Sequence, residues 1–306
     1  MSDRKKTDKK NQEAGKKTSA SKGKKQVQPE LPDRKTMTEF LSTLDVANQG
    51  DSLIRAQELI YQAWETEKAS KRIELAGEAL RISPLCADAY VLLADEGQKP
   101  IEEMIALYAK GVEAGELALG GQAFKEDKGM FWQMIETRPY MRAREGLAHM
   151  LLMTGKKEEA AKHFYEMLEL NPDDNQGIRY LLATCLQELD DRERLRQLFK
   201  VYKEEMNTLW VYAETLLSFR ETGASQQSQK LLQKAWDTNP HVRAYLTGEK
   251  SVPEMLPEYV RDGSEEDAID YAMGNIFAWV STPGAIEWIV EATLSFKMPE
   301  ETKGSA

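Results

Sequence analysis

Few side chains in this sequence have the types and spacing that catalysis or metal binding requires. The three histidines, His149, His163 and His241, match neither HExxH nor another zinc-binding spacing, and no CxxC pair occurs. The sequence also lacks G-x-x-x-x-G-K-[ST], a strand-preceded G-x-G-x-x-G and the nucleophile motif G-x-S-x-G. We therefore expect no catalytic residue, no metal site and no cofactor.

Paired carboxylates are the remaining candidates for acid–base chemistry. Glu158–Glu159 and Asp173–Asp174 fall on expected solvent faces or at helix ends. Solvated charge explains such pairs better than catalysis, because acidic side chains are rarely buried without a partner. The sequence accordingly predicts a protein that is not an enzyme, and the function left to it is binding.

Composition favours a helix-rich protein of a reducing compartment. Hydrophobic residues make up 41% of the 306 positions and charged residues 30%. Cys86 and Cys185 fall inside expected helices, so we expect buried thiols and no disulfide framework. No apolar stretch approaches the roughly 20 residues of a membrane span, and the basic N-terminus lacks the apolar segment of a secretory signal. We expect a cytoplasmic protein without a membrane span.

Charge is divided unequally along the chain. The first 35 residues carry 12 Lys/Arg against 5 Asp/Glu, a net charge of +7, and the remainder carries 29 against 46, a net charge of −17. Residues 1–36 and 297–306 are expected to be disordered tails, because segments with few apolar side chains cannot offset the entropy of ordering. The lysine-rich tail could bind nucleic acid. A solubilising or intramolecular role is favoured, since no aromatic residue interleaves the lysines.

The elements that would position a binding site are clearest in residues 141–174. Ala148 and Ala160 let two helices cross closely, Gly155 permits the reversal between them, and Pro172 ends the second helix. This pattern resembles the tetratricopeptide repeat (TPR), a 34-residue helix–turn–helix unit. It is carried by Leu147, Ala148, Leu151, Gly155, Ala160, Phe164 and Pro172. The sequence departs from the repeat at Arg144, where the signature has tryptophan, and at Met167, where it has a small residue.

A single hairpin of this kind cannot bury its own apolar face, so its neighbours should also be repeats. We expect an all-α fold, namely a TPR-like α-solenoid in which about five repeats form a right-handed superhelix with C-terminal capping helices. The expected divisions are a capping helix and two repeats (37–116), an aromatic insertion (117–140), three repeats (141–240) and a C-terminal helical cap (241–296).

Local signals predict several helix ends. Gly120–Gly121 should end a helix. Ser70 and Ser264 have the side chains of N-cap residues, and Thr282 followed by Pro283 should start the last helix.

The TPR resemblance also implies which side chains face a ligand. In such repeats, positions 2, 5, 9 and 12 of the first helix line the concave groove. Applied to this chain, the rule selects Ile54, Gln57, Tyr61, Trp64, Arg142, Glu145, His149, Arg179, Trp210 and Arg220. The three arginines would suit an acidic or C-terminal peptide held by forked guanidinium bonds. The alternative is that they pair with neighbouring glutamates across the repeats, and the sequence leaves both open.

The insertion at 117–140 is unusually aromatic for a connector. Phe124, Phe131 and Trp132 could form a second binding patch, because connectors on rigid scaffolds often carry function. The favoured alternative is that these rings bury themselves at the join between two halves of the solenoid.

Two blocks resemble a narrower family. They are residues 56–115, with RIELAGEALRISPLCADAYVLLADE, and residues 239–289, with NPHVRAYLTGEK and GSEEDAIDYAMGNIFAWVSTPGAIEW. Both are similar to conserved regions of the suppression-of-tumorigenicity-seven family, and together they cover about a third of the chain. The resemblance implies TPR-like repeats and no catalytic residues. Animal members carry membrane-associated N-terminal segments where this chain has a charged tail, so no membrane role is carried over and a bacterial relative is favoured.

Together these patterns predict a non-catalytic protein–protein interaction adaptor or scaffold. It would bind a peptide or a partner protein in the concave TPR groove. The alternative is a nucleic-acid-associated protein that uses the lysine-rich N-terminal tail.

Overall fold

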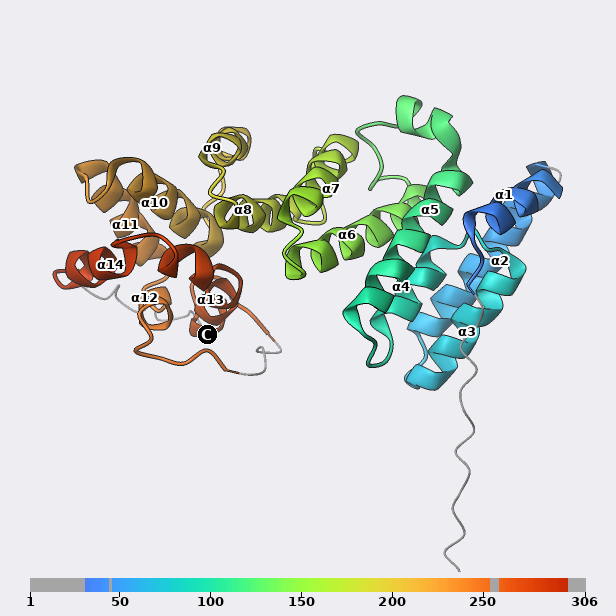
Figure 1. Ribbon diagram of the computed structural model, residues 1–306, viewed down its shortest axis with the longest axis horizontal. Helices are drawn as coiled ribbons and strands as arrows, with labels where there is room; N and C mark the ends of the chain where they lie inside the picture. Colours follow the sequence, from blue (N-terminus) through green and yellow to red (C-terminus); the bar gives the residue numbers. More distant parts are fainter. Residues whose placement is uncertain (1–30, 44–45, 254–258, 297–306) are drawn as a thin grey trace, which may run out of the picture. The chain divides into compact units, whose positions relative to one another are not determined.

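The computed structural model describes residues 31–43, 46–253 and 259–296. Every regular element in these ranges is a helix, which confirms the expected all-α fold (Figure 1). None of these helices is long and apolar enough to cross a membrane. Most of the tail expected at 1–36, up to residue 30, lies outside the described residues, as does the whole of the tail expected at 297–306.

Helices that follow one another along the chain pack in pairs. The pairs are α2 (Val46–Trp64) with α3 (Ala69–Ile82), α4 (Ala87–Asp95) with α5 (Ile101–Glu126), α6 (Arg138–Met153) with α7 (Lys157–Leu170), α8 (Ile178–Glu188) with α9 (Arg192–Val201), and α10 (Thr208–Thr222) with α11 (Gln226–Thr238). The first helix of each pair also contacts the first helix of the next. A continuous row α2–α4–α6–α8–α10 results.

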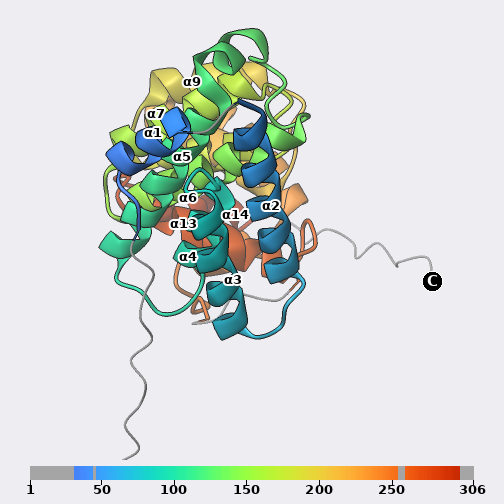
Figure 2. The same cartoon turned by 90° about the vertical axis from the view of Figure 1, so that its right-hand side faces the viewer.

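The N-terminal helix α1 (Arg34–Thr43) packs against α5. Its Met37 is fully buried, and its Arg34 pairs with Glu113 of α5 at 3.1 Å. Figure 2 turns the chain so that α2, α3 and α4 lie toward the viewer. The helix expected to cap the first pair therefore contacts the second pair.

The end of α5 differs from the sequence expectation. Gly120 breaks the helix, with φ 69° and ψ 161°, but a helical segment continues to Glu126. A positive φ of this kind is readily adopted only by glycine. The short 3-10 helix η1 (Ile135–Thr137) then leads directly into α6.

Glycines allow α5 and α6 to cross at short distance. A Cβ at Gly146 would lie 2.1 Å from the ring of Tyr108, and one at Gly115 would lie 2.9 Å from the Cβ of Tyr140. Gly111 is equally tight, with 2.9 Å to the nearest side-chain carbon. Non-bonded carbons prefer separations of about 3.5–4.0 Å, so the crossing leaves no room for larger side chains.

The C-terminal helices fold back onto earlier ones. After α12 (Val242–Leu246), α13 (Glu265–Val280) contacts α8, α10 and α12, and α14 (Ala285–Thr293) contacts α11, α12 and α13. Trp279 and Trp288 are buried in this packing. The C-terminal helices therefore cover part of the helix row in addition to its last pair.

One expected helix start is confirmed and two are wrong. The side chain of Ser264 caps α13 by accepting from the backbone N–H of Asp267. However, α3 begins after Lys68, which leaves Ser70 in its first turn. The last helix, α14, begins after Gly284 instead of Thr282. The Thr282 hydroxyl donates to the backbone carbonyl of Ala278 in α13 at 2.7 Å. Thr282 therefore completes α13, and its hydroxyl does not cap α14.

Candidate functional site

An apolar groove lies between α2, the last part of α5, η1 and the start of α6. Its volume is about 460 Å³. The apolar side chains and backbone that line it come from Leu53, Ile54, Tyr61, Leu85, Ala87, Gly115, Ala118, Leu119, Ile135, Pro139 and Tyr140. Gln57, Glu58 and Glu136 supply its polar edges. We call this surface the α2–α6 groove. Concave apolar sites of this size are typical of binding sites.

Three apolar side chains at the groove remain largely open to water. Ile54 is 59% exposed, Tyr61 43% and Ile135 60%. Trp64, one turn beyond Tyr61 on α2, is 45% exposed, and the two rings lie 5.7 Å apart. Single exposed apolar residues are common, but a contiguous group around a hollow indicates an interaction surface.

The wall of the groove depends on how closely α6 approaches α5. Gly115 lets the backbone of Tyr140 come within van der Waals distance of α5. Pro139 stands in the first turn of α6, where proline needs no hydrogen-bond partner for its nitrogen. The Tyr140 ring is thereby held at the groove and is itself buried, which raises the pKa of its hydroxyl.

A buried carboxylate ties together the three helices below the groove. Asp88 of α4 has no exposed side-chain surface. Arg142 of α6 donates to both of its oxygens, at 2.8 and 2.5 Å, and Gln57 of α2 donates at 2.8 Å. We call this arrangement the Asp88 clamp. Bidentate guanidinium–carboxylate bonds are strong and directional, so the clamp fixes the spacing of α2, α4 and α6.

Trp64 shields the outer side of this clamp. The guanidinium carbon of Arg142 lies 5.2 Å from the centre of the indole ring. Arg142 is therefore occupied on two sides, by a carboxylate and by an aromatic face. The guanidinium of Arg142, which was expected to bind an acidic ligand, is already paired with the carboxylate of Asp88.

Arg179 and Arg220, the other two arginines expected in the concave TPR groove, are also paired. Arg179 lies 2.8 Å from Asp174 and 2.9 Å from Glu205, and it stacks on the ring of Tyr180. Arg220 lies 3.3 Å from Asp190. The alternative of internal pairing therefore describes all three, although the partners are mainly aspartates. Among these partners only Glu205, beside Arg179, is a glutamate, the residue type that the sequence alternative specified.

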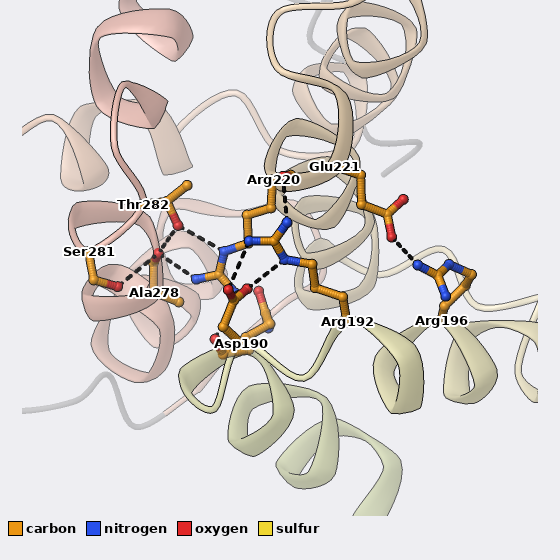
Figure 3. A network of polar contacts seen from close by, with 9 residues as sticks. Asp190, Arg192, Arg196, Arg220, Glu221, Ala278, Ser281 and Thr282 are labelled. Atoms are coloured by element: carbon orange, nitrogen blue, oxygen red, sulfur yellow. Dashed lines mark hydrogen bonds and ion pairs between the residues drawn. The ribbon is translucent and has the colours of Figure 1, made fainter.

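Arg220 lies beneath the C-terminal helices and not on an open groove. Its guanidinium donates to the carbonyl of Gln187 at 2.7 Å, to the carbonyl of Ala278 at 2.9 Å and to the hydroxyl of Thr282 at 2.8 Å. Figure 3 shows it between Asp190 on one side and the end of α13 on the other. Burial lowers the pKa of Arg220, and only 6% of its side chain is exposed.

The remaining groove candidates separate into distinct environments. Trp210 is fully buried, with Tyr180, Phe199 and Tyr202 packed edge-on around its ring. Glu145 accepts a hydrogen bond from Gln176 at 2.5 Å, and burial raises its pKa. His149 is exposed on α6. Of the candidates from the TPR rule, only Ile54, Gln57 and Tyr61 line the α2–α6 groove itself.

The aromatic residues of the insertion pack together. Phe131 is fully buried, and the ring of Phe124 lies 5.1 Å from those of both Phe131 and Tyr140. Trp132 is half-buried under the guanidinium of Arg138, 5.5 Å away. Phe124 and Phe131 shield each other from water, whereas Trp132 stays partly exposed, and a second binding patch here stays a prediction. The same insertion nevertheless contributes to the groove through Ile135 and Glu136.

The groove offers apolar contact and little reactive chemistry. Burial raises the pKa of the Cys86 thiol and of the Cys185 thiol to about 12, so both are protonated and weakly nucleophilic at neutral pH. Within the described ranges, no group of three or more His, Cys, Asp or Glu side chains could hold a metal ion. The lining of the groove therefore offers contacts mainly to apolar groups.

Comparisons with known proteins cover this region. Residues 42–171 match the model of the ST7 protein family, a range that contains every residue lining the groove. The chain is 25% identical over 277 residues to the protein ST7 homolog of Caenorhabditis elegans, covering 75% of this chain and 49% of that protein. Both comparisons support the ST7 family. The family resemblance inferred from the two sequence blocks is thus supported.

Other ST7 relatives give similar values. The protein ST7 homolog of Drosophila melanogaster is 24% identical over 263 residues, which cover 78% of this chain and 48% of that protein. The suppressor of tumorigenicity 7 protein-like of Rattus norvegicus is 25% identical over 258 residues, which cover 77% of this chain and 46% of that protein. The chain spans about half the length of these curated relatives. All three come from animals, and the bacterial source expected for this chain stays a prediction.

Proposed function

We propose that the chain is a non-catalytic protein-interaction module that binds a peptide, or a peptide-like segment of a partner protein, in the α2–α6 groove. One observation carries the proposal: Ile54, Tyr61 and Ile135 remain exposed around an apolar hollow of about 460 Å³. Covering these side chains with a ligand would remove apolar surface from water, which is the usual source of binding energy.

The proposal includes a TPR-like solenoid as the scaffold of the groove. Its support is the pairing of successive helices and the row of contacts between the first helices of the pairs. The Asp88 clamp ties three helices of this row together, and a rigid site loses less entropy on binding. Nucleic-acid binding by the N-terminal tail and a cytoplasmic location remain predictions without a supporting observation in the described residues.

The test uses a random library of 12-residue peptides displayed on phage and selected on the immobilised full-length chain. Peptides that the chain retains are synthesised, and their affinity is measured by fluorescence anisotropy. The double variant Ile54→Ser/Ile135→Ser should weaken binding by at least about tenfold, because tenfold corresponds to about 1.4 kcal/mol and two apolar contacts are lost.

A matched control is Val201→Ser/Val280→Ser. These two valines are 70% and 62% exposed, but they lie at the ends of α9 and α13, away from the groove. The control should leave the affinity unchanged. Equal affinity of the chain and the Ile54→Ser/Ile135→Ser variant for every retained peptide would disprove the proposal.

A further inference from the structure

Two acidic side chains, Glu58 and Glu136, lie at the edge of the α2–α6 groove. The other ionisable side chains that line it are the tyrosines Tyr61 and Tyr140. Glu58 comes from α2 and Glu136 from η1, so two different elements contribute them. Both side chains are exposed. Neither forms an ion pair or a side-chain hydrogen bond with another described residue.

Two arginines near the groove, Arg142 and Arg138, are engaged by other groups of the chain. Both oxygens of the Asp88 carboxylate hold Arg142. Arg138 donates to the carbonyl of Trp132 at 2.8 Å and covers its ring. Arg55 of α2 is exposed and forms no ion pair with another described residue. Because neither Glu58 nor Glu136 is ion-paired with a described residue, both carboxylates are open to a cationic ligand.

The net charge of residues 36–306, which include the groove, acts in the same direction. Residues 36–306 carry 29 basic against 46 acidic side chains. A net negative surface attracts positively charged ligands and repels acidic ones before contact. This reverses the ligand chemistry expected from the three groove arginines, because each of these is already paired within the chain.

We infer that the groove selects peptides in which apolar side chains are flanked by lysine or arginine. The inference rests on the proposed function and adds the chemistry of the ligand. The apolar side chains lie against Ile54, Tyr61 and Ile135, and the flanking cations lie beside Glu58 and Glu136. Since both carboxylates are exposed, each contact is weak and sensitive to salt.

The experiment uses the same phage library and the full-length chain. Peptides enriched on the chain but lost on Ile54→Ser/Ile135→Ser should carry a net positive charge relative to the unselected library. The tightest of these peptides is then made in two forms, one with its lysines and arginines and one with glutamine in their place. The glutamine form should bind about threefold to tenfold more weakly at 50 mM salt, and the difference should shrink at 300 mM.

Two variants locate the effect. In Glu58→Gln/Glu136→Gln the two peptide forms should bind with nearly equal affinity, because the carboxylates that distinguish them are gone. Glu158→Gln/Glu159→Gln makes the same change of net charge on an exposed turn of α7. It should keep the preference, which excludes an effect of total charge.

The outcomes separate this inference from the proposed function. Enrichment of neutral or acidic peptides that still depend on Ile54 and Ile135 would overturn the inference and leave the groove as a peptide site. If Glu58→Gln/Glu136→Gln preferred the cationic peptide over its glutamine form as strongly as the unchanged chain does, the inference would also be overturned and the groove would remain a peptide site. Peptides that bind without dependence on Ile54 and Ile135 would overturn both.

Discussion

At the scale of single residues, Asp88 is the side chain on which the groove depends. A buried charge is tolerated only when it is paired and fully hydrogen-bonded. Arg142 and Gln57 together provide three donors to this carboxylate. Because the donors lie on α2 and α6, loss of either one would affect both the stability of the chain and the shape of the groove.

Arg142→Ala should lower the free energy of unfolding by about 2–3 kcal/mol, because it leaves the Asp88 carboxylate buried without its cation. Urea denaturation followed by circular dichroism measures the change. Lys128→Ala is the control, since Lys128 and its partner Glu169 are both more than half exposed. It should cost less than about 0.5 kcal/mol. A similar small cost for Arg142→Ala would show that the clamp contributes little.

A second prediction concerns His163, whose Nδ1 accepts a hydrogen bond from Arg144 at 3.2 Å. Burial and the neighbouring charges of Arg144 and Lys162 lower its pKa to about 4. The folded state therefore favours neutral His163. Its contribution to stability is complete above pH 6.5 and is lost as the pH falls from 6.5 toward 4, because the unfolded state binds the proton first.

Nuclear magnetic resonance titration of the histidine ring protons tests this directly. The His163 resonance should titrate with a midpoint near 4. His163→Gln should also reduce the loss of stability between pH 6.5 and 4.5, measured by urea denaturation at each pH. A His163 midpoint near 6.5 would contradict the prediction.

Residue roles could be predicted from the sequence only in part. Helical spacing in the TPR resemblance identified Ile54, Gln57 and Tyr61, which do line the groove. It could not identify Asp88, because the clamp joins residues 54 positions apart and depends on how α4 and α6 cross. Paired and free arginines also look alike in a sequence. The internal partner of Arg142 became clear only once the helices were placed.

At the scale of elements, the crossing of α5 and α6 is the most constrained contact near the groove. Gly146 faces the ring of Tyr108, whose hydroxyl donates to Asp95 and so cannot easily move. Gly146→Ala should lower stability by about 2 kcal/mol, although alanine favours helix by about 1 kcal/mol over glycine. Thermal and urea unfolding measure the effect.

The matched control for this prediction is Gly274→Ala on α13. Nothing lies within 4 Å of a Cβ at that position. The change should stabilise the chain by about 0.5–1 kcal/mol, because only the helix preference acts. If both variants changed stability in the same direction, steric contact with Tyr108 would not be the cause.

Helix ends were predictable where a side chain served only its own helix. Ser264 is such a case, and it caps α13 as expected. Thr282 has the same kind of signal, but its hydroxyl also accepts from Arg220 of α10 and donates to the end of α13. Tertiary contacts therefore decided the start of α14, and these contacts cannot be read from neighbouring residues.

At the scale of the whole molecule, the buried apolar residues form two clusters. One contains core residues from Met37 to Leu217 and the other contains core residues from Val211 to Ala292. The α13–α14 helices belong to the second, and Arg220 joins α13 to the end of α8 by donating to the carbonyls of Ala278 and Gln187. Figure 3 shows Arg220 beside Ala278 and Thr282. Separate clusters of this kind often open independently of one another.

Arg220→Met should loosen the C-terminal helices selectively. The carbonyls of Gln187 and Ala278 and the hydroxyl of Thr282 would each lose one charge-assisted hydrogen bond, which we expect to cost about 2–4 kcal/mol in total. Amide hydrogen exchange followed by mass spectrometry should show faster exchange in α13 and α14 and unchanged rates in α2–α6. Arg196→Met is the control, because Arg196 forms its ion pairs with Glu193 and Glu221 in exposed positions. Uniformly faster exchange along the chain would refute this division.

The helical content and the sequential pairing of helices followed from local patterns. Small residues, turn glycines and prolines at helix ends are local signals, and they correctly indicated the all-α fold. The packing of α13 on α8 could not be foreseen, because it brings together segments about 90 residues apart, as Thr184 and Asn275 illustrate. Such distant pairing depends on surface complementarity that no periodic pattern encodes.

The long sequence separation within the Asp88 clamp has a consequence for synthesis on the ribosome. Gln57 precedes Asp88, but Arg142 follows it by 54 residues. At about 5–20 residues per second, synthesis of Arg142 follows synthesis of Asp88 by roughly 3–10 seconds. During this interval the Asp88 carboxylate has no Arg142 guanidinium to pair with. The groove can therefore close only after α6 has left the exit tunnel. Slowing translation between residues 89 and 142 should lengthen the interval in which the unfinished chain is open to chaperones and proteases.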